Sequence, residues 1–108
     1  MTRVLDGREI GIMRCYYPLP RFEGIARLIA STGSIGMAMA HYGVDQINRT
    51  KLHVKAVMPD AYEAKLLKLE KPVPMLELTH VAVDANHVPV EFSVSKYDGR
   101  FFDVQMDF

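Results

Sequence analysis

The segment from Val90 to Tyr97 carries the most concentrated set of side chains that can do chemistry. Its alternation places apolar residues on one side of an extended strand. The other side carries a carboxylate, two hydroxyls and a phenol, contributed by Glu91, Ser93, Ser95 and Tyr97. Such a face is either solvated or lines a polar cleft in which a small molecule binds, and the pattern alone leaves both interpretations open.

Residue types elsewhere argue against other kinds of site. His53 and His80 fall on different expected strands and could approach one another, but no acidic or thiol partner stands at ligand spacing, so no metal site is predicted. No Ser-His-Asp or Cys-His arrangement can be argued, and we expect neither a catalytic residue nor a cofactor. The single Cys15 cannot form an internal disulfide, which fits a reducing cytoplasm.

The composition is that of one globular domain. The chain has 108 residues, of which 49% are hydrophobic and 24% are charged. The formal net charge is +0, whereas a chain that bound DNA through its own surface would carry a basic excess. The first residues lack the apolar region of a signal peptide, and no uncharged run is long enough to span a bilayer. We therefore expect a soluble, cytoplasmic protein without a membrane partner.

The elements that position the polar strand are strands joined by tight turns, with short helices between them. We expect strands over residues 9–17, 51–58, 75–83, 90–97 and 101–106, the second of them half-buried. Asp6-Gly7 predicts a tight turn, and Asn86 suits the positive φ of the turn before Val90. This order of elements favours an α+β domain built on an antiparallel sheet.

Three helices are expected between these strands. The first carries Phe22, Ile25, Leu28 and Ile29 at helical spacing and ends at Gly33. The second begins at Ser34, a good N-cap, and ends at Gly43, and the two should pack side by side. The third begins at Asp60 with Glu63 in a capping box, and Tyr62, Leu66 and Leu69 should form its apolar stripe.

The hairpin at the start of the chain resembles a later one in plan. Val4 to Ile10 and Val83 to Val90 both read as strand, turn and strand. A helix and a strand precede the later copy, whereas the first copy starts in mid-strand at Met1. We therefore expect a two-fold repeated domain without its first strand–helix unit, and the alternative is that two hairpins look alike by chance.

Several ordered motifs point to a known family. Asp60-Ala-Tyr-Glu-Ala-Lys-Leu-Leu is followed by Pro72-Val-Pro-Met-Leu-Glu-Leu and by Val83-Asp-Ala-Asn-His-Val-Pro-Val-Glu-Phe-Ser, and Gly33-Ser-Ile and Tyr42-Gly-Val precede them. Together they resemble the UTRA effector-binding domain of GntR-family transcription regulators, of the HutC subfamily, in particular the PhnF-like branch that regulates phosphonate metabolism. The resemblance runs over essentially the whole chain.

This resemblance implies a chorismate-lyase-like fold in which residues 1–108 form an effector-binding and oligomerisation domain. The expected effector is a small anion, namely a phosphonate, a sugar phosphate or a carboxylate. It would modulate DNA binding by a winged helix-turn-helix that is not part of this chain. Met1 and Met13 stand where relatives that bind sugar phosphates have an arginine and a glutamate, which disfavours a sugar phosphate.

The resemblance also assigns effector contacts to Arg3, Ser34, Glu91, Ser93 and Tyr97. The assignment is physically reasonable, because the start of a helix and a guanidinium both favour an anion. The alternatives are that Ser34 only caps its helix and that Arg3 is a surface charge on a strand.

Association and two other functions complete the expectations. A missing first strand would leave an exposed sheet edge, and exposed edges pair, so we expect a homodimer or a higher assembly, in which strands can be exchanged. The alternative functions are a stand-alone chorismate-lyase-like enzyme that uses Glu91 and Arg3, and a decoy that forms heterodimers with an intact regulator.

Overall fold

A computed structural model describes residues 2–5 and 8–108 of the chain, and their side chains from Ile10 onward. The chain divides into two compact units. The first unit comprises residues 1–14, 52–79 and 93–108, and the second comprises residues 15–51 and 80–92. The predicted turn at Asp6-Gly7 lies outside the described residues.

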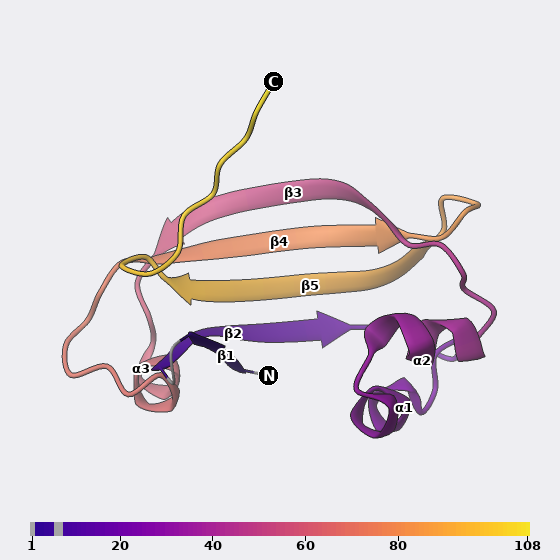
Figure 1. Ribbon diagram of the computed structural model, residues 1–108, viewed down its shortest axis with the longest axis horizontal. Coiled ribbons are helices and arrows are strands. Elements are labelled where there is room, and N and C mark those ends of the chain that lie inside the picture. The colour runs from indigo at the N-terminus through magenta and orange to yellow at the C-terminus, as the bar shows by residue number, and fades with distance from the viewer. Residues whose placement is uncertain (1, 6–7) are drawn as a thin grey trace. The chain divides into compact units, whose positions relative to one another are not determined.

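The expected α+β fold with an antiparallel sheet is confirmed. The five strands are β1 (Thr2–Leu5), β2 (Arg8–Tyr16), β3 (Asn48–Val57), β4 (Met75–Val83) and β5 (Pro89–Asp98). They form one sheet in the order β1-β2-β5-β4-β3, so β5 lies between β2 and β4, and β3 lies at an edge (Figure 1). None of the helices in the described part of the chain is long and apolar enough to cross a membrane.

Strand β1 pairs with β2 through the register Thr2↔Ile12 and Arg3↔Gly11, with an irregularity after Arg3. Gly11 is required here by packing. A Cβ atom at this position would lie 2.5 Å from Cδ1 of Tyr97, a distance that no side chain tolerates. The ring of Tyr97 therefore lies directly over the backbone of β2 within the first unit.

Two helices and the core of the second unit support one another. Helices α1 (Ile25–Thr32) and α2 (Ile35–His41) pack together, as expected, and are joined through Gly33 at φ 71°. The Ser34 hydroxyl accepts a hydrogen bond from the Met37 N–H and so caps α2, which confirms the predicted cap. The buried cluster around the two helices consists of Phe22, Ile25, Ala38, Met39, Val44, Ala82 and Val90.

The first unit contains α3 (Ala61–Leu66), whose capping box is confirmed. The Asp60 carboxylate accepts from the Glu63 N–H at 2.7 Å, and the Glu63 carboxylate accepts from the Asp60 N–H at 3.0 Å. The Glu63 side chain is fully buried, and its other oxygen pairs with Nζ of Lys96 at 2.8 Å. A cap predicted from local spacing is thus also a buried ion pair that joins α3 to β5.

Two predictions about buried faces were wrong. Strand β3 was expected to be half-buried, but nearly all of it is exposed, including Leu52 at 53% and Val54 at 38%. Tyr62 was expected in the apolar stripe of α3 and is 62% exposed. An apolar alternation shows that the two faces of a strand differ in polarity, but it does not show that another element covers the apolar face. No element covers that face of β3 among the described residues, and β3 lies at the edge of the sheet.

Two local predictions also need correction. The structure has no strand at residues 101–106. The chain leaves β5 through a turn in which the Phe101 N–H bonds to the Asp98 carbonyl, and the segment that follows gains no strand partner among the described residues. In the turn before β5 the residue at positive φ is His87, at 60°, rather than Asn86. Asp84 accepts the backbone N–H groups of Asn86 and Val88, and this wrapping leaves the left-handed position to His87.

Candidate functional site

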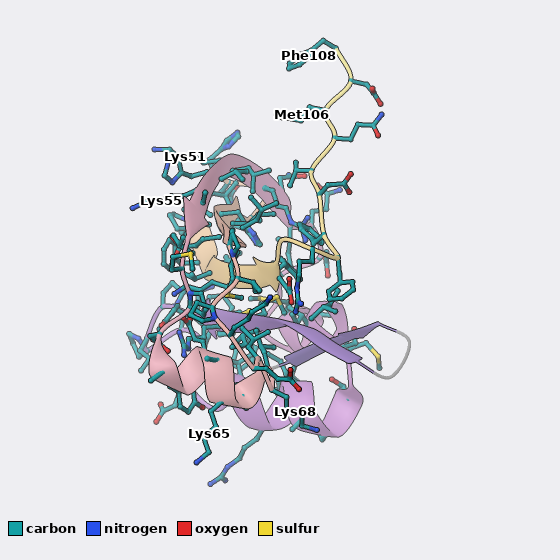
Figure 2. All side chains as sticks on the ribbon, turned by 90° about the vertical axis from the view of Figure 1, so that its left-hand side faces the viewer. Lys51, Lys55, Lys65, Lys68, Met106 and Phe108 are labelled. Atoms are coloured by element: carbon teal, nitrogen blue, oxygen red, sulfur yellow. The ribbon has the colours of Figure 1, made fainter. Side chains whose placement is uncertain are left out.

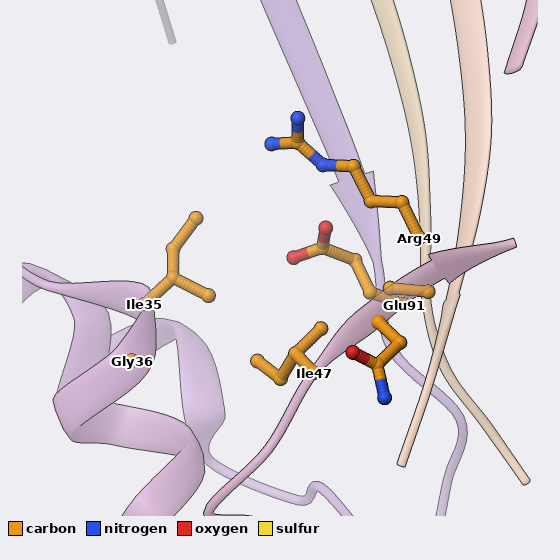
Figure 3. Close-up of a pocket in the computed structure, with 7 residues that line it drawn as sticks. Ile35, Gly36, Ile47, Arg49 and Glu91 are labelled. Atoms are coloured by element: carbon orange, nitrogen blue, oxygen red, sulfur yellow. The ribbon is translucent and has the colours of Figure 1, made fainter. Parts of the chain in front are cut away.

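The second unit contains a pocket of about 520 Å³ between the start of α2, the segment that enters β3, and strands β4 and β5. Its lining residues are Ile35, Gly36, Ile47, Asn48, Arg49, Ala82 and Glu91. Figure 3 shows the carboxylate of Glu91 directed into this space and the guanidinium of Arg49 extending along it. A volume of this size is typical of small-molecule sites, which span roughly 300–1,000 Å³.

Glu91 is held in place by side chains from both neighbouring strands. The Tyr17 hydroxyl, just after β2, donates to Oε2 at 2.8 Å. Nε2 of His80, on β4, lies 3.3 Å from Oε1. The order of the strands explains the convergence, because β5 lies between β2 and β4. Glu91 is only 9% exposed, so these two partners fix the orientation of its carboxylate.

The environment of Tyr17 keeps its phenol protonated. Burial contributes most, and the hydrogen bond and the negative charge of Glu91 act in the same direction, so the pKa of Tyr17 lies far above its ordinary value. A phenol that retains its proton remains a donor to Glu91 over the whole physiological range. The remaining lone pairs of Glu91 can accept hydrogen bonds from a hydroxyl or an ammonium group of a ligand, since a carboxylate offers about four acceptor sites.

Arg49 gives the pocket a positive group to accompany this carboxylate. A guanidinium presents donors in a planar fork that matches the oxygens of a phosphate, phosphonate or carboxylate. The pocket therefore offers an acceptor at Glu91 and an anion partner at Arg49, on walls that are otherwise largely apolar. This arrangement can bind and orient a small molecule.

A second, more apolar pocket of about 420 Å³ also touches Glu91. It is lined by Tyr16, Tyr17, Pro18, Val81, Pro89, Glu91 and Phe92, and the rings of Tyr16 and Phe92 lie 5.9 Å apart. Glu91 and its partner Tyr17 thus border an aromatic surface as well as the pocket with Arg49.

The structure places one of the five predicted contact residues in the larger pocket, namely Glu91. Ser34 lies immediately before the lining residue Ile35, with its hydroxyl used in capping α2. Ser93 and Tyr97 belong to the first unit, where Tyr97 stacks on Phe102 with ring centroids 4.1 Å apart. Arg3 lies in β1 opposite Gly11, and its side chain lies outside the described residues.

The polar face of β5 is buried, so the interpretation as a solvated face is wrong. Ser93 is completely buried, Ser95 is 6% exposed and Glu91 is 9% exposed. Among the described residues no group of three or more His, Cys, Asp and Glu side chains could hold a metal ion.

Sequence reasoning missed three residues of this site: Tyr17, His80 and Arg49. Tyr17 was taken as the end of a strand, and His80 was weighed only as a metal ligand with His53. A carboxylate on a central strand with a polar residue on each neighbour is a signal that appears only once the strand order is known. Arg49 lies in the strand β3, which was predicted to begin at Lys51.

A family model and individual relatives all point to the same family. The family model described as UTRA domain matches residues 1–103. An HTH-type transcriptional regulator of Rhizobium meliloti is 34% identical over 92 residues, which are 85% of this chain and 38% of that protein. The HTH-type transcriptional repressor PhnF of Mycolicibacterium smegmatis is 30% identical over 101 residues, which are 92% of this chain and 41% of that protein. The chain thus spans well under half the length of these relatives.

Solved structures share the fold. The effector domain of PhnF from Mycobacterium smegmatis superposes with a TM-score of 0.79 at 27% identity, over 94% of this chain and 64% of that one. The C-terminal domain of Yurk from Bacillus subtilis superposes with a TM-score of 0.87 at 20% identity, over 99% of this chain and 74% of that one.

Proposed function

The chain belongs to the UTRA domain family, the effector-binding domains of GntR-type transcription regulators, and from this premise we propose that it binds a small anionic effector in the Glu91 pocket. Binding there would alter the DNA affinity of a winged helix-turn-helix in the whole protein. The observation that carries the proposal is the pairing of two groups in one pocket, namely Arg49, which can bind an anion, and the buried carboxylate of Glu91, which Tyr17 and His80 hold in place and which can accept from the same ligand.

The proposed effector is a phosphonate, a carboxylate or a sugar phosphate. The position of Arg49 in the pocket supports the proposal that the effector is anionic. Arg3 and Ser34 support the same proposal only through the family resemblance. Phosphonates are the first class to test, because PhnF is among the relatives.

We propose further that the domain is not catalytic, acts in the cytoplasm and reaches DNA only through the rest of the protein. The relatives are named as transcription regulators, which supports all three points. A neutral net charge also speaks against direct binding of DNA by this chain. A homodimer is the proposed assembly, since β3 presents an exposed edge to a second copy.

A thermal-shift screen of the chain against methylphosphonate, 2-aminoethylphosphonate, glucose 6-phosphate and citrate tests the proposal. A compound that binds the folded state raises the unfolding midpoint by mass action. We expect an anionic compound that also carries a hydroxyl or ammonium group to raise the midpoint, with the shift lost in Arg49→Ala, which removes the partner of the anion, and reduced in Glu91→Gln, which weakens the acceptor of that group. Arg27→Ala, which removes an exposed arginine of α1 in the same unit, should leave the shift intact. Equal shifts in all three variants would exclude the Glu91 pocket as the site.

A further inference from the structure

The exposed strand β3 has a regular pattern of charge. Lys51, His53 and Lys55 alternate with Leu52 and Val54, and all five are exposed. In an extended strand the basic side chains therefore share one face and the apolar ones share the other. Because β3 ends the strand order, its outer backbone groups have no partner strand among the described residues. Figure 2 shows Lys51 and Lys55 projecting to the same side of this strand.

The C-terminal segment has the complementary pattern. Asp103, Gln105 and Asp107 alternate with Val104 and Met106, so an extended conformation gives one acidic and one apolar face. Residues 102–108 form no regular element, and Met106 is 64% exposed. In Figure 2 the segment that carries Met106 and Phe108 projects away from the strands. An apolar alternation of this kind is typical of a strand that packs one face.

The two patterns match in one antiparallel register. We propose that residues 103–107 of one copy of the chain add as a strand to the outer edge of β3 in a second copy. Asp103 then faces Lys55, Gln105 faces His53 and Asp107 faces Lys51 on one side of the new pair. On the other side Val104 faces Val54 and Met106 faces Leu52. Opposite charges and apolar pairs directly across a strand pair are each stabilising.

The charges on β3 also favour the C-terminal segment over a second β3 as its partner. If β3 paired with β3 of a second copy about His53, each Lys51 would face a Lys55, and like charges directly opposite one another are destabilising. Lysines on an exposed edge are a common protection against such self-pairing. The same two lysines that disfavour pairing of β3 with β3 would attract the acidic C-terminal segment of a second copy.

The geometry of the first unit favours a segment that comes from another copy. Phe102 stacks on Tyr97 of β5, with ring centroids 4.1 Å apart. A strand added to the outer edge of β3 would be the third strand from β5, after β4 and β3. Three strand spacings amount to about 14 Å. Asp103 is the next residue, and one step of the chain covers only about 3.8 Å. While the stacking persists, the ring of Phe102 is held at β5 and not at the outer edge of β3, which favours a second copy as the source of the added strand. Two copies that exchange this segment form a closed, symmetric dimer.

Paired charge reversals in the full chain, followed by analytical ultracentrifugation over a wide concentration range, test this contact. The first variant, Lys51→Asp with Lys55→Asp, leaves acidic residues on both partners. The second, Asp103→Lys with Asp107→Lys, leaves basic residues on both. Each variant alone should raise the dimer dissociation constant by at least about tenfold, because four attractive pairs per dimer become repulsive. An equimolar mixture should restore association to the level of the original chain, since every pair is then complementary.

A matched control reverses two lysines of the first unit that lie outside β3. Lys65→Asp with Lys68→Asp changes the net charge by the same amount as the β3 variant, at exposed positions in and after α3 (Figure 2). This control should dimerise like the original chain. Circular dichroism of each variant shows that the fold is retained.

The inference rests on the homodimer proposed above and is separable from effector binding. Dimers that are equally stable in all variants would overturn the exchanged segment while leaving the homodimer in place. A mixture of the two charge variants that does not recover association would overturn it as well. An original chain that stays monomeric at every concentration would refute both the contact and the homodimer, while the thermal-shift screen still decides the effector site.

Discussion

Replacing Tyr17 with phenylalanine should reduce the free energy of unfolding by about 1–2 kcal/mol near neutral pH. The change removes one hydroxyl, which donates to Oε2 of Glu91 over 2.8 Å. A hydrogen bond to a charged group contributes roughly 1.5–3 kcal/mol. We expect a value around or just below the lower end of this range because Tyr17 is half-buried, so water replaces part of the lost interaction.

The free energy of unfolding of this variant should also depend on pH differently from that of the original chain. Burial, with the hydrogen bond and charge of Glu91, raises the pKa of Tyr17 above its ordinary 10.0. The unfolded chain loses this proton near pH 10.0, whereas the folded chain keeps it. The stabilisation that comes from the protonated phenol is therefore fully present below that pH and is lost as the pH rises further. The loss amounts to at most about 1.4 kcal/mol per pH unit, and Tyr17→Phe should lack it.

Urea denaturation followed by circular dichroism, near neutral pH and at about pH 10.5, measures both effects. Tyr16→Phe is the matched control, because it removes the same atom one residue away from a side chain that is 54% exposed. We expect the difference in stability between the original chain and Tyr17→Phe to shrink above pH 10.0. The reasoning is refuted if the two phenylalanine variants behave alike, or if the cost of Tyr17→Phe is unchanged in a Glu91→Gln background.

Two further predictions concern packing. Met39 is fully buried among the helices of the second unit, so Met39→Ala should cost about 2–5 kcal/mol in urea denaturation, whereas Met37→Ala at a 62% exposed site of the same helix should cost little. Gly11→Ala should cost about 1–3 kcal/mol, because the added Cβ would lie 2.5 Å from Cδ1 of Tyr97. If Gly11→Ala is neutral, the ring of Tyr97 does not lie over β2 as described.

Local chemistry accounts for the elements that were predicted correctly. Ser34 caps α2 because its hydroxyl reaches a backbone N–H three residues on, and Asp60 with Glu63 closes α3 in the same way. Gly33 stops α1 by adopting a positive φ. Each of these interactions joins residues within one turn of chain, so the sequence alone carries all the information that is needed.

The wrong predictions concern surfaces rather than elements. Leu52 and Val54 alternate as a buried strand would, and so do Val104 and Met106, but each segment lacks a covering partner within the described chain. Alternation records which face is apolar and not what lies against it. The proposed exchange between copies is one way in which both patterns would be satisfied.

The family and its α+β sheet followed from ordered motifs along the chain, and Glu91 was singled out from them as a binding residue. Only the tertiary structure showed that Glu91 shares a pocket with Arg49 and takes its partners from Tyr17 and His80. The physical reason is the strand order, which brings β2 and β4 to either side of β5 although they are far apart in the sequence. Such contacts depend on long-range pairing, which no local spacing of residues encodes.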